Sequence, residues 1–352
     1  MLKLEFKPYV LNFKFTARTS RGAITDRKVW FLKVSDAMGR SGLGEVAPID
    51  RLSPESPDEV PDQLALLGKK IVGLSKPSSV EDILGFVQEH VPITFPSIRC
   101  GMETALLDLH FGGEKSIFVN DKQAISIPIN GLIWMGDLAF MRQQIAEKLD
   151  QGFNCIKLKV GSLDFEDELT IIKNLRKVSD DLVIRLDANG GFAINKVLSI
   201  LSRLNKYRIH SIEQPILPMQ PEAMELICRK SEIPIALDEE LIHVFSLSDK
   251  MELLQELRPQ YIVLKPTLHG GFSGTQEWID LAQMHGISWW VTSYLESNLG
   301  LNAIAQFASQ FKNEMHHGLG TGHLYHNNLE SPVIIAEGFL KYAKSNVWGE
   351  VF

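Results

Sequence analysis

Five charged residues recur along the chain at nearly constant spacing, and each ends a short apolar run. The intervals are 28 residues from Lys159 to Asp187, then 26 to Glu213, 25 to Asp238 and 27 to Lys265. A (β/α)8 barrel of about 250 residues devotes about 30 residues to each strand–helix unit. The spacing therefore predicts that these side chains lie at the carboxyl ends of consecutive parallel strands, around one barrel mouth.

Three carboxylates converging at that mouth would repel one another strongly unless a cation held them. Carboxylate oxygens without an accompanying His or Cys ligand suit a hard ion, which favours Mg²⁺ over Zn²⁺. We therefore expect Asp187, Glu213 and Asp238 to bind Mg²⁺, with Mn²⁺ as a substitute.

Lys157 and Lys159 alternate with the apolar residues Ile156, Leu158 and Val160, which is the period of a β-strand. Both ammonium groups therefore leave the same face of the strand, with their Cα atoms roughly 6.5–7 Å apart. Taken alone, the pattern fits an edge strand with two solvated lysines equally well. The carboxylates that follow at barrel spacing favour an enclosed site.

A divalent ion beside lysines suits removal of the proton next to a carboxylate, because the metal stabilises the ene-diolate that forms. A lysine acts as a base only when neutral, which requires its pKa to move from about 10.4 towards about 7–8. Lys157 and the metal both push the pKa of Lys159 in that direction, so we expect Lys159 to be the base. Lys265, across the mouth, would be a second acid/base or a fixed cation.

The flanking segments predict a second domain that caps the barrel. Residues 1 to about 50 alternate like an antiparallel meander, and residues 55–125 are mostly helical in pattern. We predict an α/β fold in which a TIM barrel is joined to an N-terminal α+β capping domain. The expected parts are the capping domain 1–122, the catalytic barrel 123–320, with its first strand near 125–132 and its eighth near 315–318, and the tail 321–352, which packs back on the capping domain through a strand near 333–336.

Composition excludes several classes of partner. A formal net charge of −7 with no basic stripe argues against nucleic acid, and no apolar run approaches the roughly 18 residues of a membrane span. The 45% hydrophobic and 22% charged residues are ordinary for a soluble enzyme. The cysteines, Cys100, Cys155 and Cys228, are too few and scattered for a disulfide framework or zinc motif. We expect a cytoplasmic protein with a small-molecule substrate, and the sequence leaves its oligomeric state open.

Several motifs together resemble the muconate-lactonising subgroup of the enolase superfamily, over nearly the whole chain. They are Lys157-Leu158-Lys159, Asp187-Ala188-Asn189, Glu213-Gln214-Pro215, Asp238-Glu239 and Lys265-Pro266. The resemblance implies an enolase-like, modified barrel in which a lysine base acts beside a Mg²⁺-stabilised ene-diolate. It also implies that Asp187, Glu213 and Asp238 are metal ligands, and that Lys159 is the base with Lys157 as its companion. The residues expected to contact this set without binding the metal themselves are Arg185, Asn189 and Glu239.

Within the subgroup, the end of the seventh strand discriminates between reactions. Dipeptide epimerases carry Asp-x-Asp there to hold the substrate's ammonium group, whereas this chain has Ser293-Tyr294-Leu295-Glu296-Ser297. That stretch, with 129–136 and 318–322, resembles the o-succinylbenzoate synthases, which dehydrate 2-succinyl-6-hydroxy-2,4-cyclohexadiene-1-carboxylate to 2-succinylbenzoate in menaquinone biosynthesis. We expect Glu296 to point away from the site or to cap the following helix.

The substrate of such a synthase carries two carboxylates, and the candidate substrate-binding residues are Arg18, Arg21, Asn130, Thr292, Ser293 and Gly320. The stretch 18–23 is either a solvated hairpin loop or a lid whose arginines meet the anion. Backbone N–H groups of the glycine-rich stretch 318–322 could hold a carboxylate.

Three other functions compete with a dehydratase of this family. The strongest is an N-acylamino-acid racemase or dipeptide epimerase that uses both Lys159 and Lys265. Less favoured are a muconate cycloisomerase and a non-catalytic barrel whose charges form a structural network, which would explain neither the lysine placement nor the set of metal ligands.

Overall fold

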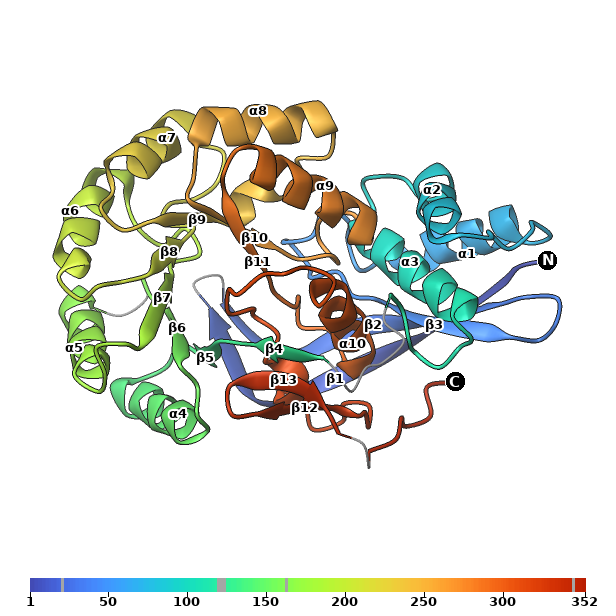
Figure 1. Ribbon diagram of the computed structural model, residues 1–352, viewed down its shortest axis with the longest axis horizontal. Coiled ribbons are helices and arrows are strands. Elements are labelled where there is room, and N and C mark those ends of the chain that lie inside the picture. The colour runs from blue at the N-terminus through green and yellow to red at the C-terminus, as the bar shows by residue number, and fades with distance from the viewer. Residues whose placement is uncertain (20–21, 119–124, 162–163, 344–345) are drawn as a thin grey trace.

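A curled parallel sheet and an antiparallel cap beside it make up the chain (Figure 1). The computed structural model describes residues 1–19, 22–118, 125–161, 164–343 and 346–352. Among these, seven parallel strands are hydrogen-bonded in chain order from β5 to β11. Helices lie on the outer side of this sheet, while the cap and both chain ends lie at the opposite end of the molecule (Figure 1).

The parallel strands and their crossover helices follow the predicted repeat, since parallel neighbours require a long connection, usually helical. The strands are β5 (Gly131–Ile133), β6 (Cys155–Lys159), β7 (Val183–Asp187), β8 (Ser211–Glu213), β9 (Ile235–Leu237), β10 (Tyr261–Leu264) and β11 (Ser288–Val291). The helices are α4 (Leu138–Asp150), α5 (Phe165–Arg176), α6 (Ile194–Asn205), α7 (Pro221–Lys230), α8 (Leu247–Leu257), α9 (Gly271–Met284) and α10 (Asn298–Ala308), with short 3₁₀ turns η2 (Glu239–Leu241) and η3 (Thr321–His323).

The strand predicted near 125–132 is divided between two sheets, which corrects the expected start of the barrel. Its first part, β4 (Ser126–Pro128), pairs with β13 (Phe339–Tyr342), which in turn pairs with β12 (Val333–Ala336). The barrel proper begins at Gly131. Pro128 has no backbone N–H to donate to a ladder, so the run breaks there and changes sheets.

The eighth position of the barrel is held by isolated bridges rather than by a full strand. His317 bridges Ile129, and Gly318 bridges Thr292. The Asn130 N–H donates to the His317 carbonyl over 3.0 Å, and the Gly318 N–H donates to the Val291 carbonyl over 2.9 Å. The (β/α)8-type barrel is confirmed, and a short extended segment closes it.

The cap is the predicted antiparallel meander followed by helices. The strands are β1 (Lys3–Thr19), β2 (Gly22–Ser35) and β3 (Ser41–Val46), and the helices are α1 (Val60–Ile71), α2 (Val80–His90) and α3 (Pro96–His110). Helix α3 is buried between β3 and the barrel helix α9. Ser97, which follows Pro96 and could cap this helix, does not; its N–H donates to Glu55 Oε1 over 2.7 Å.

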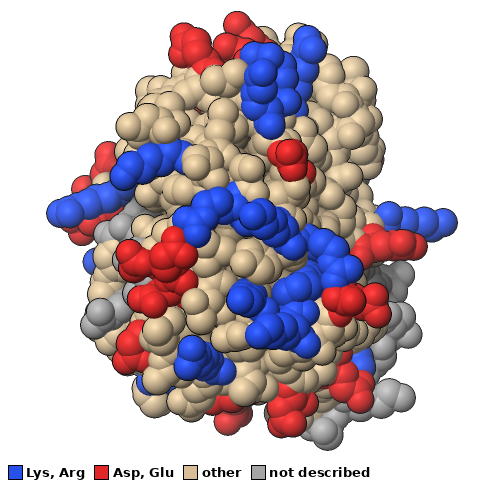
Figure 2. Space-filling view, turned by 90° about the vertical axis from the view of Figure 1, so that its left-hand side faces the viewer, with Lys and Arg blue, Asp and Glu red and all other residues tan. Residues whose placement is uncertain are grey.

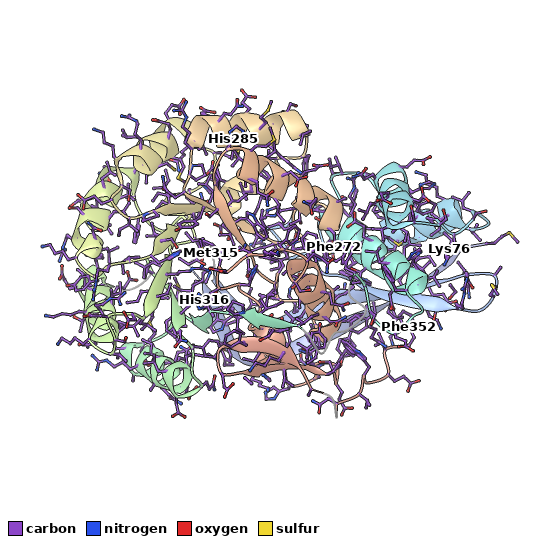
Figure 3. All side chains as sticks on the ribbon, in the orientation of Figure 1. Lys76, Phe272, His285, Met315, His316 and Phe352 are labelled. Atoms are coloured by element: carbon purple, nitrogen blue, oxygen red, sulfur yellow. The ribbon has the colours of Figure 1, made fainter. Side chains whose placement is uncertain are left out.

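Two buried carboxylates of the cap meet the N-termini of barrel helices. Glu45 in β3 accepts the N–H groups of Ser297 and Gly300 over 2.8 and 2.9 Å at the start of α10. Glu103 in α3 accepts the Phe272 N–H and the Ser273 hydroxyl at the start of α9, where Phe272 is labelled in Figure 3. Helix N-termini favour anions, although burial raises the pKa of both carboxyls to about 7.

The C-terminal segment runs along the cap strand β1. Lys14 donates its N–H to the Leu324 carbonyl over 2.8 Å, and His326 donates to the Asn12 carbonyl over 2.9 Å. The Phe352 ring lies 5.1 Å from the Lys7 ammonium group. These contacts place the C-terminal segment against the cap, while the division of the chain at residues 122 and 320 stays a prediction.

The outer surface of the barrel helices carries charges of both signs. Figure 2 shows Lys and Arg gathered on this face, with Asp and Glu between them. Arg203 pairs with Glu166 at 2.7 Å and Arg229 with Glu225 at 2.9 Å. Across the described residues, no helix combines the length and apolar character that crossing a membrane would require.

We predict that Gly44→Ala lowers the free energy of unfolding by about 1–3 kcal/mol. A Cβ at Gly44 would overlap the Gly101 carbonyl of α3, so β3 and α3 would have to separate. Gly85→Ala in α2 is the matched control, because nothing lies within 4 Å of its added Cβ. That change should stabilise the helix by about 0.5–1 kcal/mol. Urea unfolding measures both, and equal effects would contradict the close packing of β3 on α3.

Candidate active site

The charged residues found by spacing come together at one end of the parallel sheet. Register places Lys159 beside Asp187 and Asp187 beside Glu213, across β6, β7 and β8. Asp238 follows β9 directly and Lys265 follows β10. The structure thus gathers all five at the carboxyl ends of consecutive strands, as the intervals predict.

Each carboxylate at this mouth contacts a lysine. Lys157 Nζ lies 2.6 Å from Glu213 Oε2 and 2.9 Å from Asp187 Oδ2. Lys159 Nζ lies 2.6 Å from the same Asp187 oxygen, and Lys265 Nζ pairs with Asp238 Oδ1. One buried lysine, Lys157, and two partly buried ones therefore act as counter-ions for three buried carboxylates.

The surroundings of Asp187 and Glu213 shift the pKa values of these two carboxyls in opposite directions. Burial opposes the charge of Asp187, but Lys157 and Lys159 outweigh it and hold its pKa well below the usual range. Burial and then the neighbouring Asp187 carboxylate raise the pKa of Glu213 well above its usual range. Lys157 is also disfavoured by burial, yet Asp187 and Glu213 raise its pKa above the ordinary value.

The three carboxylates suit a hard divalent ion, although lysine ammonium groups contact the carboxylate oxygens. Among the described residues, no three or more His, Cys, Asp or Glu side chains are already arranged as a metal cluster. Asp187, Glu213 and Asp238 nevertheless supply three buried carboxylates, and a further cation would relieve the repulsion between neighbouring carboxylates.

Asn189 links Lys159 to Glu239 through two hydrogen bonds. Asn189 Oδ1 accepts from Lys159 Nζ over 2.7 Å, and its amide Nδ2 donates to Glu239 Oε1 over 2.9 Å. Asn189 has a left-handed backbone, with φ of 42°, a conformation that asparagine tolerates better than most residues. The base candidate is therefore held by Asp187 on one side and Asn189 on the other.

Arg185 is buried inside the barrel, but its direct contacts are not with the carboxylates. Its guanidinium carbon lies 3.8 Å from the centre of the Trp290 ring, and it donates to the His316 carbonyl over 2.7 Å. Met315 and His316 lie on the inner side of the strand ring (Figure 3). The part assigned to Arg185 beside the metal ligands stays a prediction.

A cavity of about 870 Å³ lies between the barrel mouth and the cap. Its lining includes the lysines and carboxylates together with four predicted substrate-binding residues, Asn130, Thr292, Ser293 and Gly320. Asn130 is 4% exposed, and the described residues offer no hydrogen-bond partner to its Oδ1. The Ser293 hydroxyl lies 2.7 Å from that of Thr321.

The hairpin between β1 and β2 reaches the same cavity. Gly22, Ala23 and Ile24 are among its lining residues. Arg18 pairs with Ala23 through its backbone in β1, but its side chain, like the whole of Arg21, lies outside the described residues. The choice between a lid and a solvated hairpin loop stays a prediction.

Sequence reasoning missed Arg27 and an aromatic wall. Arg27 is 4% exposed and donates to the carbonyls of Ala47, Pro48 and Tyr294, which ties the cap to the loop after β11. Its alternation with buried Val29 would have placed it on the inward face of β2. The wall consists of Phe15, Trp134 and Phe140, where the centres of the first two rings are 5.8 Å apart and their planes meet at 65°.

Glu296 does not face the cavity. Its Oε2 accepts the Tyr294 N–H over 2.6 Å, and its Oε1 accepts the Thr267 hydroxyl. The expectation that it points away is correct, but the cap of α10 is Ser297, whose hydroxyl accepts the Leu299 N–H. No carboxylate of residues 293–297 is therefore available to a substrate.

Comparison with known proteins places this geometry in a family. The model of the enolase C-terminal domain-like family matches residues 140–345. The o-succinylbenzoate synthase of Desulfotalea psychrophila is 40% identical, over 96% of this chain and 98% of that protein. The chain belongs to the o-succinylbenzoate synthase family of the enolase superfamily.

Solved structures agree with this assignment. The crystal structure of MenC from Desulfotalea psychrophila matches with a TM-score of 0.87 and 38% identity, over 97% of this chain and 99% of that one. The L-Ala-D/L-Glu epimerase of Bacillus subtilis, in a substrate-liganded complex, matches with a TM-score of 0.84 at 20% identity, over 99% and 97%. The second likeness concerns the fold alone. Enolase-superfamily members generally depend on a divalent metal ion.

We predict that Arg27→Met lowers the free energy of unfolding by about 1–3 kcal/mol, because buried carbonyls lose their donor. It should also raise KM, since Arg27 joins the Pro48 and Tyr294 walls of the cavity. Arg142→Met is the control: Arg142 is an exposed residue of α4 outside the lining of the cavity, and its loss should change the stability by less than about 0.5 kcal/mol. Thermal unfolding and steady-state kinetics separate the two, and an Arg27 variant that behaves like the Arg142 variant would contradict the link.

Proposed function

We propose that this protein dehydrates 2-succinyl-6-hydroxy-2,4-cyclohexadiene-1-carboxylate to 2-succinylbenzoate, a step of menaquinone biosynthesis. The observation that carries the proposal is the 40% identity over nearly the full length of an o-succinylbenzoate synthase. The site is consistent with it, because Lys159 and Lys265 line one cavity together with three carboxylates. The substrate is a small dicarboxylate, and the enzyme is a carbon–oxygen lyase.

The proposed metal ligands are Asp187, Glu213 and Asp238, and the proposed ion is Mg²⁺, with Mn²⁺ as a substitute. When bound, the ion would stabilise negative charge on the oxygens of an ene-diolate. The fit rests on three buried oxygen donors and on the like-charge repulsion at Glu213. A buried group of carboxylates binds a hard cation more readily than a softer one.

Lys159 would remove the proton at the carbon that carries the ring carboxylate. Its ammonium group is held by Asp187 and Asn189, and the base requires the neutral form. The proton taken up would then pass to the departing hydroxyl, so that the C–H and C–O bonds break, water leaves and the ring becomes aromatic. Lys157 stays charged between Asp187 and Glu213.

Lys265 would act as a fixed cation that stabilises the developing anion. Its side chain enters the cavity from β10, four strands along the sheet from β6, and pairs with Asp238. A single elimination needs one proton acceptor only, so Lys265 need not exchange a proton.

Substrate binding is proposed for the polar lining of the cavity. Asn130, Thr292, Ser293 and Gly320 contribute to it, and the buried Asn130 Oδ1 is suited to a substrate donor. Arg18 and Arg21 would meet the anion from the hairpin over the cavity. We also propose a cytoplasmic location, because the buried cysteines Cys100, Cys155 and Cys228 are free thiols.

An epimerase or racemase is the second candidate, since both Lys159 and Lys265 reach the cavity and could exchange protons on opposite faces. A dipeptide epimerase also needs an anion for the substrate's ammonium group. Glu296, the carboxylate of the loop after β11, is committed to Tyr294 and Thr267. This observation favours dehydration.

The experiment that tests the function offers both substrate classes to the purified enzyme in D₂O. We expect Mg²⁺ to support aromatisation of the cyclohexadiene, chelation to abolish it, and Mg²⁺ or Mn²⁺ to restore it. Ultraviolet absorbance follows the aromatic product, and proton NMR follows α-deuteration of a dipeptide or acyl-amino acid. Rapid α-deuteration without aromatisation would instead make the protein an isomerase, and full turnover in metal-free protein would contradict the metal ligands.

We predict that Lys159→Ala lowers kcat by about 10²–10⁴ or more, because it removes the general base. Lys173→Ala, an exposed lysine of α5, is the control and should leave kcat unchanged. Lys157→Ala should also be severe, since it leaves Asp187 and Glu213 without a shared counter-ion. If the Lys159 variant keeps more than about a tenth of the wild-type kcat, the base is another residue.

A further inference from the structure

The turn that follows β10 sets the direction of Lys265. In that turn the His269 N–H donates to the Lys265 carbonyl over 2.9 Å, and the Lys265 N–H points back to ring nitrogen Nδ1 of His269 over 3.1 Å. Lys265 and His269 are therefore joined in both directions across one turn. Lys265 lies between β10 and the turn, and its side chain lines the cavity.

The hydrogen bond to the His269 ring gives the Lys265 N–H an acceptor that the neighbouring strand does not supply. The neighbouring strand β9 ends at Leu237, and its pairing with β10 ends at Ile262. A buried N–H without an acceptor costs about 1–3 kcal/mol, so the main chain at Lys265 depends on His269. The arrangement is like a capping box, in which a side chain of the first turn accepts the N–H of the residue that starts it.

The ring is held in one protonation state. An accepting Nδ1 requires the proton of a neutral imidazole to be on Nε2. Burial and the adjacent Lys265 cation lower the pKa of His269 to about 3, which keeps the ring neutral while Nδ1 accepts. The described residues supply no acceptor for Nε2, and the ring lines a cavity of about 20 Å³, enough for about one water molecule.

Packing alone does not account for a histidine here. The ring is 7% exposed and lies 6.2 Å from the Trp278 ring, where an apolar side chain of similar size could also fit. Such a side chain would leave the Lys265 N–H without an acceptor. The distinctive contribution of His269 is therefore its lone pair.

We propose that His269 is a positioning residue that fixes, through the main-chain N–H of Lys265, where the Lys265 ammonium group lies in the cavity. The inference rests on the proposed function, in which Lys265 stabilises the developing anion. It adds a residue outside the catalytic cavity on which that cation depends.

The test compares His269→Asn with His269→Leu, two side chains of nearly the same shape. The Asn Oδ1 can take the place of Nδ1 as acceptor, whereas Leu has none. We expect the Leu variant to lose about tenfold or more in kcat, because small misplacements of catalytic groups are costly, with KM changed less than about threefold. The Asn variant should recover most of that loss. Thermal unfolding of each variant corrects the rates for folded protein.

A second comparison shows whether the effect passes through Lys265. In a Lys265→Ala background, His269→Leu should cause no further fall in kcat, since the group it positions is gone. Equal losses in the Asn and Leu variants, or a full additional loss in the Lys265→Ala background, would overturn the proposal. If the Leu variant does not fold, His269→Gln replaces it, because its amide lies where Nε2 was. Wild-type protein that fails to aromatise the cyclohexadiene would refute the proposed function instead.

Discussion

Charge balance in a buried space is the constraint on which this barrel depends. Three carboxylates and three lysines leave consecutive strands toward one cavity, and each carboxylate contacts a lysine. Isolated, any of these charges would be very costly to bury. Together they form a network in which Lys157 is shared by Asp187 and Glu213.

The cap completes the site by the same physical means. Glu45 and Glu103 reach from the cap to the first turns of α10 and α9, where unpaired N–H groups favour an anion. Arg27 reaches the loop after β11 and donates to its backbone. The cavity is therefore enclosed by two domains that share an apolar core and are also joined by hydrogen bonds from side chains to the main chain.

Much of the fold and of the charged site could be predicted from the sequence, because a regular repeat carries both. Asp187, Glu213 and Lys265 each end an apolar run. The carboxyl ends of parallel strands lie along the same edge of their sheet, so the residues that end these runs come together there. The repeat does not predict the two places where the barrel departs from it. Pro128 divides the expected first strand, and the eighth strand is reduced to isolated bridges at His317 and Gly318. Contacts between distant segments, such as that of Arg27 with Tyr294, follow from three-dimensional packing that no spacing records.

The division of the first strand also bears on how the chain is assembled. Strand β4 precedes the barrel in sequence, yet its partner β13 lies near the end of the described chain, where Lys341 pairs with Ser126. During synthesis, β4 must wait until the whole barrel has left the ribosome, since domains generally fold as the chain emerges. Pairing over such a separation is slow. The small sheet β12–β13–β4 is thus expected to form late, after the whole barrel has been synthesised.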